Sequence, residues 1–110
     1  MKLYTLRISL SNGETEIEEN EARESKTNKD CLVYTDKNDR VVKRTILDNP
    51  SFLINGGFPY ALVRTLNQDK IEGYKEELTR LVIDKGGKFI QKQKDLIEKM
   101  EMSLNNLRNV

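Results

Sequence analysis

Apolar and polar residues alternate near the start of the chain. From residue 4 to residue 10 every second side chain is apolar, which is the period of a β-strand with one buried face. The Asn12-Gly13 pair that follows is typical of a tight hairpin turn, because both residue types tolerate positive φ angles. This pattern predicts an opening hairpin whose second strand begins near residue 14.

Three further strands are expected before residue 66. The segments "CLVYT" and "RVVKRTIL" are rich in β-branched residues and predict a second hairpin. Gly56-Gly57 and Pro59 indicate a loop or bulge, followed by a fifth strand from Tyr60 to Thr65. The acidic second strand, residues 14–24, is expected at an edge, where charge discourages pairing with another chain.

The period changes after residue 66. Apolar residues then recur at steps of three and four, and Asn67 offers a helix cap. Gly86-Gly87 interrupts this helical pattern, and each interior glycine costs roughly 0.8 to 1 kcal/mol relative to alanine. We favour one long helix over residues 67–108, kinked or closely approached at the glycines, over a helical hairpin that turns there, because Val82, Gly86 and Phe89 continue one face.

These elements predict an α+β fold in a single domain, residues 1–110. A five-stranded antiparallel bent sheet, or a small open barrel, would occupy residues 1–66, and a long amphipathic helix would follow over residues 67–108. From Lys70 to Leu107 such a helix would be roughly 55 Å long at 1.5 Å per residue, so its second half should project with an apolar stripe exposed. The stripe predicts a homodimer through the C-terminal helix, or a partner's groove, with the contacts Leu96, Met100, Leu104 and Leu107.

Composition removes several classes of function. The chain has no histidine and one cysteine, which excludes the usual acid-base triads and thiolate metal sites. Cys31 is expected to be a small buried hydrophobe and not a nucleophile. We therefore predict no catalytic residue, no metal and no cofactor. The absence of a signal-like or membrane-spanning stretch predicts a cytoplasmic protein with no membrane role.

The acidic second strand has two functional interpretations beside a solvated edge that resists aggregation. Its glutamates could hold a divalent ion or form a carboxylate pair. Alternatively, an acidic ridge that resembles a phosphate backbone could occupy the nucleic-acid cleft of another protein. On this second interpretation the partner-binding residues include Glu14, Glu16, Glu18 and Glu21.

Basic residues provide an alternative function. The formal net charge is +1, which argues against a globally basic nucleic-acid binder, but local patches can still contact phosphates. Aromatic residues near the basic ones would allow stacking on single strands. The alternative is therefore a small nucleic-acid-binding domain that uses Lys43, Arg44, Lys85, Lys88 and Lys92.

The layout also carries a resemblance. An opening hairpin "MKLYTLRISLSNGETE", a second hairpin "YTDKNDRVVKRTIL" and the passage "PYALVRTLNQDKIEGYKEEL" into a long charged helix resemble small proteins of phages and mobile elements of low-GC Gram-positive bacteria. The resemblance implies an accessory role in the host cytoplasm, such as an inhibitor that covers a site on a host nuclease or defence protein, as anti-CRISPR proteins do. No functional residue is carried over from it.

Overall fold

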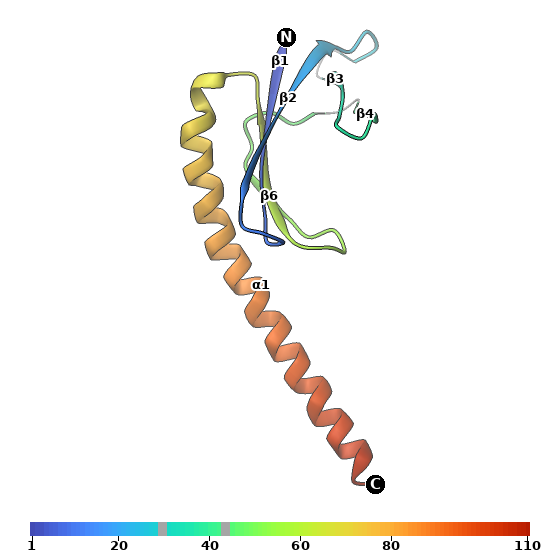
Figure 1. The fold of residues 1–110 in the computed structure, drawn as a ribbon. Coiled ribbons are helices and arrows are strands. Elements are labelled where there is room, and N and C mark those ends of the chain that lie inside the picture. Colours follow the sequence, from blue (N-terminus) through green and yellow to red (C-terminus); the bar gives the residue numbers. More distant parts are fainter. Residues whose placement is uncertain (29–30, 43–44) are drawn as a thin grey trace.

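The computed structural model describes residues 1–28, 31–42 and 45–110. Within these residues the fold is α+β: a curled, half-barrel antiparallel sheet and one long C-terminal helix (Figure 1). The sheet has six strands in the order β4-β3-β2-β1-β6-β5. The strands are β1 (Lys2–Ser9), β2 (Thr15–Glu24), β3 (Leu32–Thr35), β4 (Val41–Val42), β5 (Ser51–Leu53) and β6 (Tyr60–Thr65).

The opening hairpin forms as predicted. Gly13 has a φ of 71° and its N–H donates to the Ser9 carbonyl at 2.8 Å, so glycine at this turn avoids the strain that a β-carbon would meet. The predicted fifth strand, Tyr60–Thr65, is β6, which pairs with β1 on the side opposite β2. Strand β1 is therefore central in the sheet.

The prediction of five strands is wrong by one. The additional strand is β5, a short segment that pairs with β6 and lies just before the loop indicated by Gly56-Gly57 and Pro59. Pro50 precedes β5 directly, and proline is compatible with the start of an edge strand because no ladder hydrogen bond is required there. Strand β4 covers Val41–Val42, and among the described residues of the longer strand expected there, 45–47 are not in a strand.

The prediction that β2 is an edge strand also needs correction. Strand β2 lies between β1 and β3, but only Ala22, Arg23 and Glu24 pair with β3. Its acidic first half pairs with β1 alone. Charge is thus tolerated in β2 because the half that carries most of it keeps one side free of a neighbouring strand.

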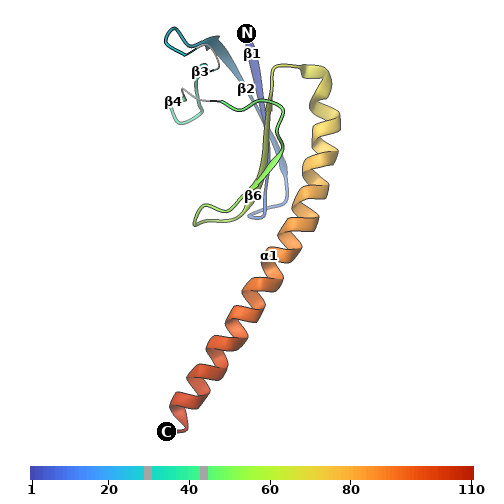
Figure 2. The same cartoon turned by 180° about the vertical axis from the view of Figure 1, so that it is seen from behind.

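The helix begins with a short 3-10 turn, η1 (Gln68–Lys70), and continues as α1 (Ile71–Arg108). The Asn67 side chain accepts a hydrogen bond from the Asp69 N–H at 3.0 Å, which is the predicted cap. Figures 1 and 2 show one curved helix that passes through Gly86-Gly87 without a turn. The continuous helix, and not the hairpin, is therefore the arrangement observed.

The main core lies between α1 and one face of the sheet. Alternate residues of β1 and β6 meet Leu78 and Val82 of the helix there, and Leu78 is fully buried. A second, smaller core forms on the opposite face, where the β3–β4 hairpin packs over one end of β1 and β2. Its buried members are Leu3, Ala22, Leu32 and Tyr34. Cys31 is buried beside β3, as expected.

The molecule is far from spherical. Its radius of gyration is 18.8 Å and its longest dimension is 64 Å, whereas a compact chain of this length would have a radius of gyration of about 13 Å. The excess comes from α1, whose second half extends beyond the sheet (Figure 1). In the part of the chain that the structure describes, no helix combines the length and apolarity needed to cross a bilayer.

Candidate functional site

Gly86 marks the place where the helix leaves the sheet. It is buried, and a β-carbon built on it would lie 3.2 Å from Cδ1 of Leu10. The neighbouring Gly87 is exposed, and a β-carbon there would meet nothing within 4 Å. The first glycine therefore permits close contact between the helix and the end of the opening hairpin, and the second has no packing role.

Beyond this contact, the helix carries the predicted apolar stripe, and no other part of the described structure packs against it. Every residue from 90 to 110 is exposed, including large apolar side chains that are 46% to 71% exposed. The structure brings the four predicted contact residues together along one shallow groove, where Lys99 and Ser103 accompany them. These four are Leu96, Met100, Leu104 and Leu107.

The sheet divides the predicted acidic ridge. Glu14 lies in the segment before β2, while Glu16 and Glu18 share the concave face of the sheet opposite α1 and line a cavity there. Glu21 lies on the other face, and its carboxylate is 3.5 Å from the N-terminal ammonium. The four glutamates therefore do not form one continuous row on the surface.

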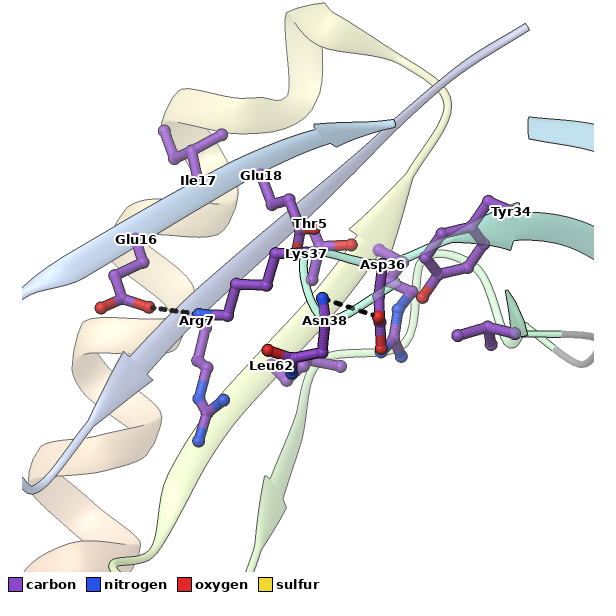
Figure 3. A pocket seen from close by; sticks show the side chains of 12 residues that line it. Thr5, Arg7, Glu16, Ile17, Glu18, Tyr34, Asp36, Lys37, Asn38 and Leu62 are labelled. Carbon is purple, nitrogen blue, oxygen red and sulfur yellow. Dashed lines mark hydrogen bonds and ion pairs between the residues drawn. The ribbon is translucent and has the colours of Figure 1, made fainter. Parts of the chain in front are cut away.

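A partly open cavity on the concave face has a volume of about 500 Å³. Strands β1, β2 and β6 form its floor, and the β3–β4 hairpin forms a wall (Figure 3). Strand pairing fixes two rows of side chains across the floor: Glu18, Thr5 and Arg64 in one row, and Glu16 and Arg7 in the next.

Several charged groups of this cavity already have partners. Lys37 extends from the hairpin to Glu16, with Nζ 3.8 Å from Oε2 (Figure 3). Asp36 Oδ1 accepts hydrogen bonds from the N–H groups of Asn38 and Arg40 at 3.0 and 2.9 Å, so this carboxylate holds the turn of the hairpin. The guanidinium of Arg7 stacks over the aromatic ring of Tyr60, with Cζ 4.1 Å from the ring centroid.

Two residues that line the cavity each have a buried donor atom without a partner in the described structure. Thr5 is 8% exposed, yet its hydroxyl oxygen forms no hydrogen bond in the described structure, and neither does the buried Nε of Arg64. The sequence analysis missed both residues, because it expected only one face of the opening strand to be buried and assigned no role to the polar positions of residues 60–65. Their alternation with the apolar positions was the available signal, but the covering hairpin was not predictable from it.

The basic residues of the alternative function are only partly placed. Lys85, Lys88 and Lys92 lie together around a shallow depression that also contains Phe52, Ile54 and Phe89. Lys43 and Arg44 lie outside the described residues. The structure thus brings three of the five predicted cations together, and places aromatic side chains among them.

A polar contact anchors the first turn of α1 to the loop before β5. The Tyr74 hydroxyl donates to Asp48 Oδ1 at 2.8 Å, and Lys70 Nζ lies 3.7 Å from the same oxygen. This hydrogen bond, helped by desolvation, raises the pKa of Tyr74 to about 12. The same bond is the main reason why the pKa of Asp48 falls below its ordinary value. The pair therefore makes the helix attachment dependent on pH.

In residues 1–28, 31–42 and 45–110, no cluster of three or more histidine, cysteine, aspartate or glutamate side chains is arranged to hold a metal ion. Comparisons with protein families, with curated proteins and with solved structures find no match to this chain. The proposals below therefore rest on its own residues and their geometry.

Proposed function

We propose that this chain is a non-catalytic protein-binding protein whose projecting half-helix is the contact surface, and that a second copy of the chain is its partner. The observation that carries the proposal is the uncovered stripe between residues 90 and 107, where large apolar side chains are about half exposed on one side of an otherwise charged helix. Exposed contiguous apolar surface of this kind marks interaction sites.

The spacing of the stripe suits pairing of two helices. Its residues alternate steps of three and four, which is the repeat that keeps one seam facing a partner helix. The seam spans about 27 Å at 1.5 Å per residue, or five helical turns. Gln93 is its one polar member, and a polar residue in such a seam favours one register at some cost in stability. The seam residues are Ile90, Gln93, Ile97, Met100, Leu104 and Leu107.

The flanking residues favour an antiparallel pair. Leu96 and Ser103 border one side of the seam, and Lys94 and Glu101 border the other. If Ile97 of one copy packs against Met100 of the other, Lys94 of each copy lies beside Glu101 of its partner. The two-fold symmetry of the dimer forms the Lys94–Glu101 pair twice. The same arrangement brings the borders that carry Leu96 in the two copies against each other.

A parallel pair of helices would form neither the Lys94–Glu101 ion pairs nor the contact between the two Leu96 sides. In that arrangement the Leu96 border of one helix faces the charged border of the other, so Leu96 would lie against Glu101. Lys94 and Glu101 would not meet at all. No ion pair in the described structure involves either residue within one chain, so both charges are available to a partner.

Charge reversal tests the orientation and the association together. We expect the intact protein to be a dimer in size-exclusion chromatography with light scattering. Lys94→Glu or Glu101→Lys alone should weaken the homodimer about tenfold, because two attractive pairs of roughly 0.3 to 0.5 kcal/mol become repulsive. Mixing the two variants should restore association as a heterodimer, which native mass spectrometry resolves. Glu98→Lys, the same charge change on the far side of the helix, serves as the control.

The possible outcomes separate the parts of the proposal. A monomeric intact protein would refute self-association. A dimer in which Glu101→Lys behaves like Glu98→Lys would refute the antiparallel register but leave the helix as the contact surface. The further role as an inhibitor of a host nuclease or defence protein stays a prediction, and the division of the glutamates between two faces restricts its acidic surface to Glu16 and Glu18 on the concave side.

A second candidate function is binding of single-stranded nucleic acid at the shallow depression near Gly86, where the helix leaves the sheet. The observation that favours it is the grouping of Lys85, Lys88 and Lys92 around Phe52 and Phe89, since cations can contact phosphates while aromatic rings stack on bases. Fluorescence anisotropy with a labelled oligothymidine tests it. Binding should fall steeply with added salt and be lost in Lys88→Glu/Lys92→Glu. Affinity that the double variant leaves unchanged would refute it.

A further inference from the structure

We infer that the cavity on the concave face binds a small molecule that carries an oxyanion, either a carboxylate or a phosphate, next to a hydrogen-bond donor such as an ammonium or hydroxyl group. Its volume of about 500 Å³ falls within the range of small-molecule sites in proteins. This site is independent of the projecting helix, which lies on the other side of the sheet (Figures 1 and 2).

The oxyanion would bind between Thr5 and Arg64. These residues are direct neighbours across the β1–β6 ladder, and each has a buried donor atom without a hydrogen-bond partner in the described structure. Buried polar atoms without partners are rare in proteins because losing water without replacement is costly. A guanidinium beside a hydroxyl is a natural receptor for a carboxylate or phosphate oxygen.

The neighbouring carboxylate sets the second requirement. Glu18 of β2 is the strand partner of Thr5 on the side opposite Arg64. One row of the floor therefore carries a guanidinium, a hydroxyl and a carboxylate in sequence. The second row is less available, because Glu16 is paired with Lys37. A bare, highly charged anion would be repelled by Glu18, whereas a ligand with a donor next to its oxyanion could satisfy both ends of the row.

The first test examines the free protein. Thr5→Val replaces the hydroxyl by a methyl group of similar shape. Because the buried hydroxyl has no partner to lose, we expect the melting temperature to rise by about 4 °C, while ligand binding is weakened. A lower melting temperature for Thr5→Val would show that the hydroxyl contributes to the fold, and would overturn the inference.

The second test titrates the ¹⁵N-labelled protein with four probes: acetate, inorganic phosphate, glycine and glycolate. We expect saturable amide shifts at Thr5, Glu18 and Arg64 with dissociation constants near 1 mM for the best probe, since each probe has few atoms. Glycine or glycolate should bind about tenfold more tightly than acetate. A preference for inorganic phosphate over all three carboxylates would contradict the repulsion expected from Glu18 and would overturn the requirement for a donor next to the oxyanion.

Variants decide whether the shifts report this cavity. Arg64→Gln should abolish saturation by every probe, and Glu18→Gln should remove the advantage of glycine over acetate. Arg80→Gln removes the same charge from the outer face of α1 and should change neither. Shifts that stay linear for all four probes, or that saturate equally in Arg64→Gln, would overturn the inference.

Discussion

Gly86 and Leu10 are in contact where the helix passes the end of the opening hairpin, and a β-carbon on Gly86 would approach Cδ1 of Leu10 to 3.2 Å. This contact explains one of two adjacent glycines in an otherwise regular helix. It also sets the boundary between the half of α1 that completes the core and the half that is uncovered. Packing against the sheet and the proposed association with a partner would therefore use successive parts of the same helix.

The two glycines should respond differently to alanine. Gly87→Ala should raise the free energy of unfolding by about 0.8 to 1 kcal/mol, because it gains helix propensity in open space. Gly86→Ala should gain less, since the Leu10 side chain must move, and Gly86→Val should lower it by about 1 to 3 kcal/mol through overpacking. Urea denaturation measures all three. An equal gain from both alanine variants would contradict a close contact at Gly86.

Strong local periodicity made parts of this fold predictable. The alternation in β1 and β6 and the three-and-four spacing of α1 are dictated by burial against one neighbour, so they are visible within a short window of sequence. Strand β5 lacks such a pattern. Its three residues adopt a strand because β6 offers a free edge, and pairing of that kind depends on tertiary context more than on local propensity.

The projecting stripe could be predicted from local sequence, whereas the cavity could not. Leu96 and Met100 share a face because they are four residues apart in one helix, so their grouping follows from the sequence alone. Thr5 and Arg64 are neighbours only because β1 pairs with β6, and the hairpin that covers them folds over from another part of the chain. The sequence could show that both are polar, but not that they meet or are buried.

The contact between Tyr74 and Asp48 should give stability a dependence on pH at both extremes. The lowered pKa of Asp48 contributes stability that is present above its ordinary value of 3.8 and is lost as the pH falls through the folded value. The raised pKa of Tyr74 contributes stability that is complete below 10.0 and is lost as the pH rises toward about 12.

Tyr74→Phe should therefore lower the free energy of unfolding at pH 7 by about 1 kcal/mol and flatten both changes. Asp48 has a φ of 54°, a conformation that asparagine tolerates well, so Asp48→Asn keeps the backbone and an acceptor while it removes the acidic dependence. Thermal denaturation from pH 3 to pH 11 measures these effects. A pH profile that is unchanged in Tyr74→Phe would show that the hydrogen bond does not contribute.

Negative charge on the exposed stripe should prevent association without affecting the fold. Leu96→Asp combined with Met100→Asp places one carboxylate in the proposed seam and one on its border, and we expect a soluble monomer with the far-ultraviolet circular dichroism of a folded protein. Met102→Asp is the matched control, because Met102 is 66% exposed but lies about 200° around the helix from Met100. It should remain a dimer. An unchanged oligomer in the double variant would contradict a helix-mediated interface.

Truncation should separate the two halves of α1. A chain that ends at Gln93 keeps Gly86 beside Leu10 and Phe89 beside Phe52 and loses only exposed residues. We expect it to be monomeric and to melt within about 2 °C of the Leu96→Asp/Met100→Asp variant, which supplies the monomeric reference because dimerisation itself raises the melting temperature. A chain that ends at Lys85 keeps Leu78 and Val82 but loses the Gly86 contact, so it should melt lower. If the chain ending at Gln93 unfolds, the projecting half contributes to the stability of the monomer, and its exposed stripe would have to contact the sheet in solution.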